Sequence, residues 1–324
     1  MTTLDEVTTV SPRESSVRIS IVVPHLGDVV AFEESLVSVL ENRPAGAEVL
    51  VAHDGSYQDP FDLGDEVRFV NAASNDLPTL LSAAADRATG RFLHVIGNGV
   101  RATHDWTADA IEHLCGEDVA MVAPVVRLAT EGRVTAAGWS DSSTDVMVPI
   151  GRGAKGISRR QAATVRGVYL HASFWRLPEF RSAVRALSCD DAIAAEFAWS
   201  RLLTAAGWRC EIAIESSMIG SPESLLHSPG FRRGFTLRSL ASEIDERSVA
   251  GSVMVAAAAN VLVPTRLISV ARWADVAGQA AAMVREAACV RSIRYDQIRS
   301  PQDTAVTLPM SIPSIEMQTF RRAA

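Results

Sequence analysis

Residues 18–24 read RISIVVP, residues 48–52 read EVLVA and residues 91–96 read RFLHVI. Each is a short run of mostly apolar, often β-branched residues, which predicts a strand that is buried on both faces of a sheet. Stretches of helical length and spacing separate the runs, at residues 31–40 and 77–89. This alternation predicts an α/β fold with a Rossmann-like, mostly parallel sheet flanked by helices.

Composition changes along the chain divide it into four predicted parts. Residues 1–16 are rich in Ser, Thr and Glu and are expected to form a disordered tail. Residues 17–235 contain the strand and helix alternation and form one predicted domain. Residues 236–299 are rich in alanine and predict a helical C-terminal extension, and residues 300–324, with three prolines, predict a flexible tail.

The charge balance argues against one class of partner. The 324 residues include 38 acidic and 31 basic side chains, which gives a formal net charge of −7. A generally basic nucleic-acid-binding surface is therefore not expected, and no nucleic-acid partner is predicted. The four cysteines form no Cys-x-x-Cys pair, so neither a zinc site nor a disulfide framework is indicated.

No segment of the sequence has the length and hydrophobicity of a membrane span. The longest apolar run near the C-terminus, residues 253–263, is shorter than the ~20 residues that a span requires. The first 18 residues have no apolar core of the signal-peptide type. We therefore expect a cytoplasmic protein, and peripheral contact with the inner face of a membrane stays open.

Polar or glycine-containing clusters follow three of the predicted strands. Pro24 and His25 follow the first strand, residues 53–56 (His-Asp-Gly-Ser) the second, and residues 97–99 (Gly-Asn-Gly) the strand at 91–96. Parallel strands place their carboxyl ends at one edge of a sheet, and ligands of open α/β sheets bind beyond that edge. The sequence thus predicts a single ligand site that is shared by these clusters.

The order of these motifs resembles that of the inverting family 2 glycosyltransferases of the GT-A fold. In that family the first strand ends in Pro-Thr-Tyr-Asn, where this chain has Pro24-His25-Leu26-Gly27, and the second ends in Asp-Asp-Gly-Ser, where it has residues 53–56. The Ala-x-Gly unit of the family is matched by residues 88–90, and its later helix, which ends in an Ala-Gly-Trp-Arg pattern, is matched by LLTAAGWRCEI at 202–212. The resemblance covers residues 18–235 and implies transfer of a sugar from a nucleotide sugar.

The sequence departs from the family at its catalytic motifs. The register of the Asp-x-Asp metal motif falls on Gly97-Asn98-Gly99, so both carboxylates are missing. Mg²⁺ and Mn²⁺ prefer carboxylate oxygens, so no protein metal ligands are assigned, no cofactor is expected, and a divalent metal is disfavoured although not excluded. In the Glu-Asp-x-Asp motif, which supplies the catalytic base, the base position falls on Glu196, and Asp191 replaces it if the register differs by one turn.

The same resemblance implies roles for other residues, each with a plain structural alternative. Asp54 is the candidate contact to the nucleotide base, or it stabilises a turn. Further nucleotide-binding candidates are Pro24, His25, Gly55, Gly97, Asn98 and Gly99, and the glycines are equally consistent with a turn. Arg101, Arg152 and Lys155 are candidates for binding phosphate, although the stretch GRGAKGISRR at 151–160 also suits a solvated loop. Trp139 is the candidate to stack on an acceptor, or it belongs to the core.

Three functions remain open at the level of sequence. The first is a glycosyltransferase that uses a UDP- or GDP-sugar and a glycan or lipid acceptor without the usual metal motif. The second is a catalytically inactive relative that binds a nucleotide, a glycan or a partner protein. The third, another nucleotide-binding α/β protein such as a nucleotidyltransferase, is weakened because no phosphate-binding glycine motif follows the first strand. His227 lies where some GT-A enzymes place a metal ligand, but a lone histidine is assigned no role.

Overall fold

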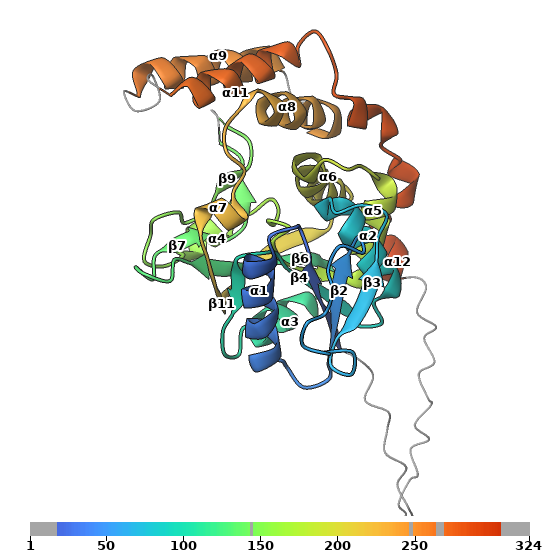
Figure 1. Cartoon of the computed structure of the whole chain (residues 1–324). Coiled ribbons are helices and arrows are strands. Elements are labelled where there is room, and N and C mark those ends of the chain that lie inside the picture. Colours follow the sequence, from blue (N-terminus) through green and yellow to red (C-terminus); the bar gives the residue numbers. More distant parts are fainter. Residues whose placement is uncertain (1–17, 143–144, 246–248, 264–268, 306–324) are drawn as a thin grey trace, which may run out of the picture.

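The computed structural model describes residues 18–142, 145–245, 249–263 and 269–305. It consists of a central sheet with helices packed against it and a layer of C-terminal helices above (Figure 1). The α/β fold class with helices flanking a sheet is confirmed. The predicted tail at residues 1–16 and residues 306–324 of the predicted C-terminal tail lie outside the described residues.

The elements of the described chain run in the following order: β1 (Ile19–Pro24), α1 (Val29–Glu41), β2 (Ala47–His53), β3 (Arg68–Asn71), α2 (Leu77–Arg87), β4 (Phe92–Ile96), β5 (Val100–Ala102), α3 (Ala108–Leu114), β6 (Val119–Arg127), β7 (Val134–Ala136), β8 (Trp139–Ser140), β9 (Val148–Pro149), α4 (Arg159–Ala162), β10 (Ala172–Arg176), α5 (Leu177–Ala186), α6 (Ala192–Ala205), β11 (Arg209–Gly220), α7 (Pro222–Leu225), α8 (Phe231–Asp245), α9 (Val249–Leu262), α11 (Val270–Ala281), two short 3₁₀ turns (Ala288–Ser292 and Tyr295–Gln297) and α12 (Pro301–Ala305).

The main sheet has the strand order β3-β2-β1-β4-β10-β6-β11-β5, with β7 added alongside β6. Strands β3, β2, β1 and β4 pair in parallel, as the alternation of strands and helices predicts. Strand β10 then lies antiparallel between β4 and β6, so the complete sheet is mixed. This insertion brings the start of β10 to the same edge of the sheet as the end of β4, because the two strands run in opposite directions.

The three strands that decide the fold are buried as their sequences predict. Every residue of β1 and β4 is buried, and five of the seven residues of β2 are buried. Helices α1 and α2 each begin at an aspartate, Asp28 and Asp76, whose carboxylate accepts a hydrogen bond from a backbone N–H of the first turn. The core thus fixes β1, β2 and β4 side by side, and their carboxyl ends meet at one edge.

Helices α8, α9 and α11 form the upper layer of the molecule (Figure 1). Helix α8 packs on α6 of the sheet domain and on α11. Where α8 crosses α11, a Cβ atom at Gly234 would overlap with the backbone carbonyl of Asp275, so the two helices approach at backbone distance. The domain boundary predicted at residue 235 falls inside helix α8. Because α8 also packs on α6, it joins the C-terminal layer to the sheet domain.

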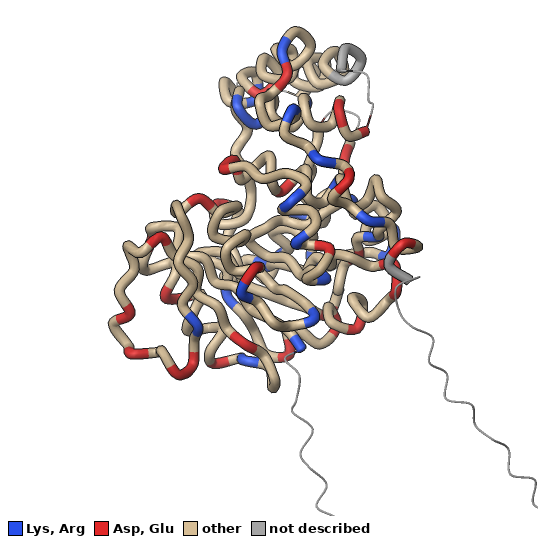
Figure 2. Tube along the Cα trace, turned by 90° about the vertical axis from the view of Figure 1, so that its right-hand side faces the viewer, with Lys and Arg blue, Asp and Glu red and all other residues tan. Residues whose placement is uncertain are grey.

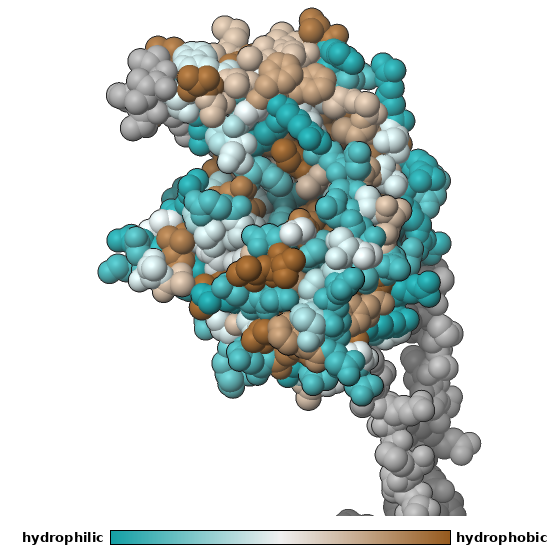
Figure 3. Space-filling view, viewed as in Figure 1, coloured by the Kyte–Doolittle hydropathy of each residue, from teal (hydrophilic) through white to brown (hydrophobic). Residues whose placement is uncertain are grey.

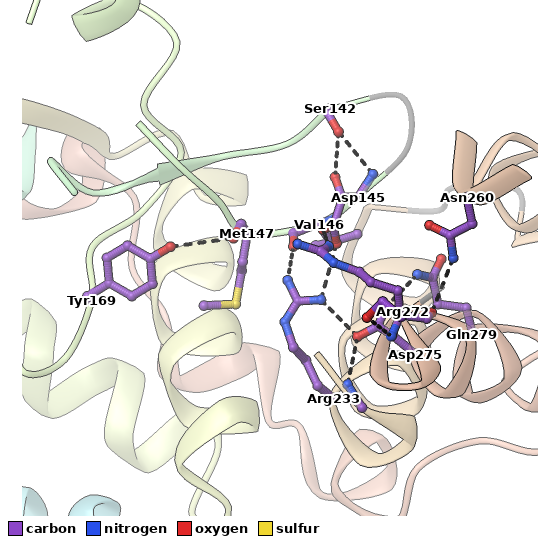
Figure 4. A network of polar contacts seen from close by, with 12 residues as sticks. Ser142, Asp145, Val146, Met147, Tyr169, Arg233, Asn260, Arg272, Asp275 and Gln279 are labelled. Atoms are coloured by element: carbon purple, nitrogen blue, oxygen red, sulfur yellow. Dashed lines mark hydrogen bonds and ion pairs between the residues drawn. The ribbon is translucent and has the colours of Figure 1, made fainter. Parts of the chain in front are cut away.

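A buried network of charged residues joins this layer to the loop before β9 (Figure 4). The Arg233 guanidinium, on α8, forms ion pairs with Asp145 (3.2 Å) and Asp275 (2.9 Å) and donates to the carbonyl oxygen of Val146 (2.7 Å). Arg272, on α11, pairs with the second carboxylate oxygen of Asp145 at 3.2 Å. The network holds the segment at 145–149 against the C-terminal helices.

Charged residues of both signs are intermixed along the chain in the view of Figure 2, without a continuous basic stretch. Among the described residues, no helix combines the length and the hydrophobicity that crossing a membrane requires.

Replacing Arg233 by Met tests the network between the two layers. The substitution leaves the carboxylates of Asp145 and Asp275 buried without their shared cation, so we expect the free energy of unfolding to fall by about 3 kcal/mol or more. Urea denaturation measures this change. The matched control is Arg232→Met, one residue earlier on α8, where the exposed guanidinium pairs with Asp191 and the expected loss is within about 1 kcal/mol. Equal losses for the two variants would contradict a special role of the network.

Candidate functional site

The ends of β1 and β2 bring His25 and Asp54 to the same edge of the sheet. Pro24 is buried as the last residue of β1, and the N–H of His25 donates to the carbonyl oxygen of Ala52 in β2. Asp54 is exposed, and its carboxylate accepts hydrogen bonds from the backbone N–H (3.0 Å) and hydroxyl (2.6 Å) of Ser56. Both hydrogen bonds hold the pKa of Asp54 below its usual value, so this carboxylate is ionised at neutral pH.

The His25 imidazole is buried within an aromatic cluster with Phe32 and Tyr57. Neither ring nitrogen of His25 has a hydrogen-bond partner in the described chain, and the same holds for the buried hydroxyl of Tyr57. Burial lowers the pKa of His25, against the opposing influence of Asp54, so the ring is neutral at neutral pH. The unpartnered polar atoms of His25 and Tyr57 thus lie buried close together at this edge.

Residues 97–99 lie at the end of β4, next to the start of α1. The N–H of Gly97 donates to the carbonyl oxygen of His171, and the N–H of Gly99 donates to Ala31 and to the Ser35 hydroxyl. These two amides are therefore bonded within the chain and are not free to bind a phosphate. The side-chain oxygen of Asn98 is buried and has no hydrogen-bond partner in the described chain.

The imidazole of His171 occupies the space into which a side chain at position 97 would project. A Cβ atom at Gly97 would overlap with Nδ1 of His171, and it would also lie too close to the Cγ and Cβ atoms of His171. His171 directly precedes β10, and the antiparallel insertion of this strand beside β4 brings the residue there. Glycine at position 97 and histidine at position 171 are thus sterically complementary, and an aspartate at position 97 does not fit this arrangement.

Glu196, on α6, is the buried carboxylate of the site. Its side chain is 1% exposed, one oxygen accepts the backbone N–H of Leu170 at 2.7 Å, and the other lies 3.2 Å from Nε2 of His227. His227 follows α7 in the chain and its side chain is 20% exposed. The structure therefore places Glu196 beside a histidine that was assigned no role from the sequence.

Burial and charge act differently on the two histidines near Glu196. Burial lowers the pKa of His171 to about 4, which the attraction of Glu196 does not offset, so this ring is neutral at neutral pH. For His227 burial also disfavours the charged form, but the adjacent Glu196 carboxylate outweighs it and raises the pKa above its ordinary value of 6.5. The Glu196 carboxylate thus favours the protonated form of His227.

A small cavity of about 60 Å³ opens beside His227. It is bounded by the segments on both sides of β9, the turn before β10, the segment after α7 and the C-terminal helices, and Figure 3 shows the molecular surface hollowed between the upper helices and the sheet domain. Ligand sites for molecules the size of drugs commonly measure ~300–1,000 Å³, so the cavity holds one group of a nucleotide sugar and not the whole molecule. Its lining residues are Asp145, Met147, Pro149, Arg152, Tyr169, Leu226, His227, Pro229, Arg233 and Arg272.

The three phosphate candidates lie in different surroundings. Arg152 lines the cavity beside His227, from the loop after β9. Arg101 lies half-buried on β5, opposite Ile219 of β11, and Lys155 is exposed in the same loop as Arg152. Among the three, Arg152 is the one that the structure brings to the cavity.

The donor set of this site does not suit a divalent metal. Within the described ranges, no group of three or more His, Cys, Asp or Glu side chains is arranged to hold a metal ion. His171 fills the space at Gly97, and Asn98 supplies one neutral oxygen where the resemblance would require carboxylates.

Two predicted site residues have structural roles instead. Trp139 is fully buried, stacks on Phe197 and donates its indole N–H to the carbonyl oxygen of Val168, so the prediction that it stacks on an acceptor is wrong. Asp191 accepts hydrogen bonds from the first backbone N–H groups of α6 and pairs with Arg232 at 3.0 Å. It therefore caps this helix.

Sequence reasoning missed Tyr169, His171 and Arg233. The first two lie in the turn before β10, which begins at Ala172. The sequence contains one signal for His171: Gly97 has no side chain, which leaves room for a ring. Identifying that ring as His171 requires knowing that β10 lies beside β4. Arg233 comes from the start of α8, near the end of the resemblance.

Comparison with solved structures identifies the fold. The chain is similar to GalNAc-T7, solved with UDP, GalNAc and Mn²⁺, at 13% identity and a TM-score of 0.51, with 72% of this chain and 51% of that chain covered. It thus spans about half the length of GalNAc-T7. The chain has the GT-A glycosyltransferase fold.

Two structures of TarS from S. aureus are also similar, each with a TM-score of 0.46. The first is 12% identical, with 75% of this chain and 43% of that chain covered. The second, TarS 1–349 in complex with UDP-GlcNAc, is 13% identical, with 74% and 71% covered. No protein-family model and no curated protein sequence matches the chain.

Substitution of Gly97 by Ala tests the steric fit between Gly97 and His171. The added methyl group meets a half-buried imidazole whose Nδ1 is enclosed, so we expect a loss of about 1–3 kcal/mol in unfolding free energy. In a His171→Ala background the same change removes the clash, and its cost falls to within about 0.5 kcal/mol. Thermal or urea unfolding of the four proteins measures this coupling. Gly64→Ala is the control, because a Cβ atom there meets nothing within 4 Å. Equal costs of Gly97→Ala in both backgrounds would refute the proposed fit.

Proposed function

We propose that this chain is an inverting glycosyltransferase of the family 2 type that binds a UDP- or GDP-sugar and transfers the sugar to a glycan or lipid hydroxyl without a protein-bound metal. The observation that carries the proposal is the buried Glu196–His227 pair, which lies beside the turn that packs His171 against Gly97 at the end of β4. Open α/β sheets bind ligands at this edge. Residues that are far apart in the sequence thus meet where the resemblance expects the donor.

The nucleotide would lie along the edge from Asp54 toward Asn98. Asp54 is exposed and ionised, which suits recognition of N–H groups of a base. His25 and Asn98 supply polar atoms that have no partner within the described chain. Pro24, Gly55, Gly97 and Gly99 shape the backbone of the same edge, and Gly55 has a φ of 94°, which a residue with a Cβ rarely adopts.

The diphosphate would lie beside the cavity, where Arg152 compensates its charge. Arginine offers a planar set of donors that binds phosphate oxygens two at a time, and its charge does not depend on pH. Arg101 and Lys155 remain secondary candidates, since neither lines the cavity. A cation from the protein would thus stabilise the leaving diphosphate in place of a divalent metal.

The second candidate is a catalytically inactive relative that binds a nucleotide or a glycan, or serves as a scaffold. The size of the cavity favours it, because about 60 Å³ leaves little room for a sugar and an acceptor together. The two candidates differ in turnover and share the binding edge.

Isothermal titration calorimetry with UDP, GDP and their sugars, each with EDTA and with Mn²⁺, tests the proposal. We expect binding of at least one nucleotide at equal affinity in both conditions. Binding that requires Mn²⁺ would contradict the metal-free site, and no binding of any nucleotide would contradict the proposed function.

Asp54→Ala tests the recognition of the nucleotide base. Because the carboxylate is the charged group at the strand end, we expect nucleotide affinity to fall roughly tenfold or more. The control is Asp59→Ala, since the Asp59 side chain likewise accepts hydrogen bonds from backbone N–H groups two and four residues later. Unchanged affinity in folded Asp54→Ala, or equal losses in both variants, would count against base recognition by Asp54.

Arg152→Gln tests the phosphate contact. We expect weaker binding of UDP by roughly tenfold, with little change in the binding of uridine, because only the diphosphate carries the charge. Arg160→Gln, an exposed residue of α4, is the matched control and should leave both affinities unchanged. Equal effects of Arg152→Gln on UDP and uridine would assign the residue to another part of the site.

A further inference from the structure

The position of Glu196 prevents it from meeting a substrate directly. The side chain is 1% exposed, its Oε2 is occupied by the N–H of Leu170, and its Oε1 is covered on the side of His227. A general base must come within hydrogen-bond reach of the proton that it removes. The residue in the family's base position thus lies behind another side chain.

His227 is the side chain that separates Glu196 from the cavity. Its Nε2 faces Glu196, and the residue lines the cavity together with Arg152 and Tyr169. The second ring nitrogen, Nδ1, makes no hydrogen bond to the part of the chain that the structure describes. The two nitrogens of an imidazole point in diverging directions, so contact of Nε2 with Glu196 leaves Nδ1 available on another side of the ring.

We propose that His227 is the general base of this site and that Glu196 is a positioning residue which fixes its tautomer and stabilises its protonated form. This inference rests on the proposed transferase function and replaces the assignment of the base to Glu196. A carboxylate that orients a histidine, which in turn removes a proton from a hydroxyl, is a recurrent arrangement in enzymes. In this protein, the histidine of such a pair would remove the proton from the hydroxyl group that accepts the sugar.

The chemical step requires only the side chains of this site, the donor and the acceptor. Nδ1 of neutral His227 takes the proton of the acceptor hydroxyl, or of water in hydrolysis. The acceptor oxygen forms a bond to the anomeric carbon, and the bond from that carbon to the diphosphate oxygen breaks, with its electron pair remaining on the diphosphate. The imidazolium that forms lies with Nε2 3.2 Å from the Glu196 carboxylate, so the two opposite charges stabilise each other.

The surroundings of His227 tune it for this role. The raised pKa depends on Glu196, while burial and Arg233 act against it. The other titratable or charged groups that face the ring or line its cavity are Asp145, Arg152, Tyr169, His171, Asp191 and Arg272. Buried His171 stays neutral at neutral pH, so it adds no fixed positive charge beside His227.

The first experiment measures the pairing without any substrate. Histidine signals of the full chain are titrated by NMR, and the His227 signal is assigned from its absence in His227→Asn. We expect the His227 pKa to fall by about one unit in Glu196→Gln, because the neighbouring negative charge is lost. Glu223→Gln, an exposed carboxylate on α7, is the control and should leave it unchanged. An unchanged His227 pKa in Glu196→Gln would overturn the pairing.

The second experiment measures the role in turnover. Binding to the wild-type protein is first compared for UDP-glucose, UDP-N-acetylglucosamine and GDP-mannose. Hydrolysis is then followed for the donor that binds most tightly. We expect His227→Asn to lose at least ~100-fold in rate while donor affinity stays within about threefold. The wild-type rate should rise with pH through the His227 pKa, and Glu196→Gln should move this inflection to lower pH.

Outcomes for the inference and for the proposed function are separable. Hydrolysis by His227→Asn at the wild-type rate, or a wild-type protein that binds a donor and never hydrolyses it, overturns the general base and leaves nucleotide binding intact. A wild-type protein that binds no nucleotide sinks the proposed function, whereas the NMR titration still reports on the pair.

Discussion

The buried carboxylate of Glu196 is the constraint around which the site is organised. An ionised carboxylate inside a protein is costly unless charged or hydrogen-bonding partners surround it. Its partners are the backbone N–H of Leu170 and the ring of His227, so helix α6, the turn before β10 and the segment after α7 must converge. The same turn carries His171 to Gly97, and this connects the pair to the end of β4.

This convergence explains how the site differs from one built around a metal. A metal site at residues 97–99 needs carboxylates that project from the strand end, whereas here the space at Gly97 belongs to an imidazole that is neutral at neutral pH. Positive charge comes to the cavity from Arg152, Arg233 and Arg272 instead. Two of these arginines belong to the C-terminal helices, and Asp145 binds both of them, so the C-terminal layer helps to form the cavity.

Much of the fold was predictable because burial leaves a local signal in the sequence. The runs at β1, β2 and β4 are apolar over their whole length, and a strand covered on both faces requires such a run. The position of Asp54 at the edge followed from the same runs. The antiparallel insertion of β10 was not predictable, because its pairing with β4 and β6 depends on residues far away in the chain.

The site was predictable only in part for the same reason. Glu196 could be found from its distance to the motif at 202–212, but its burial behind His227 depends on how α6 packs. Trp139 shows the same limit: the sequence left acceptor stacking and core packing both open, and packing against Phe197 buries the ring completely. Side chains that are brought together by non-local packing leave no spacing in the sequence that would identify them.

A crystal structure of the chain soaked with a nucleoside diphosphate and Mn²⁺ tests most directly whether this edge of the sheet is a metal-free nucleotide site. The expected result is a base beside Asp54, a diphosphate within hydrogen-bond distance of Arg152, and no metal ion bound to residues 97–99. A nucleotide bound elsewhere, or a metal ion that bridges Asn98 and the diphosphate, would contradict it.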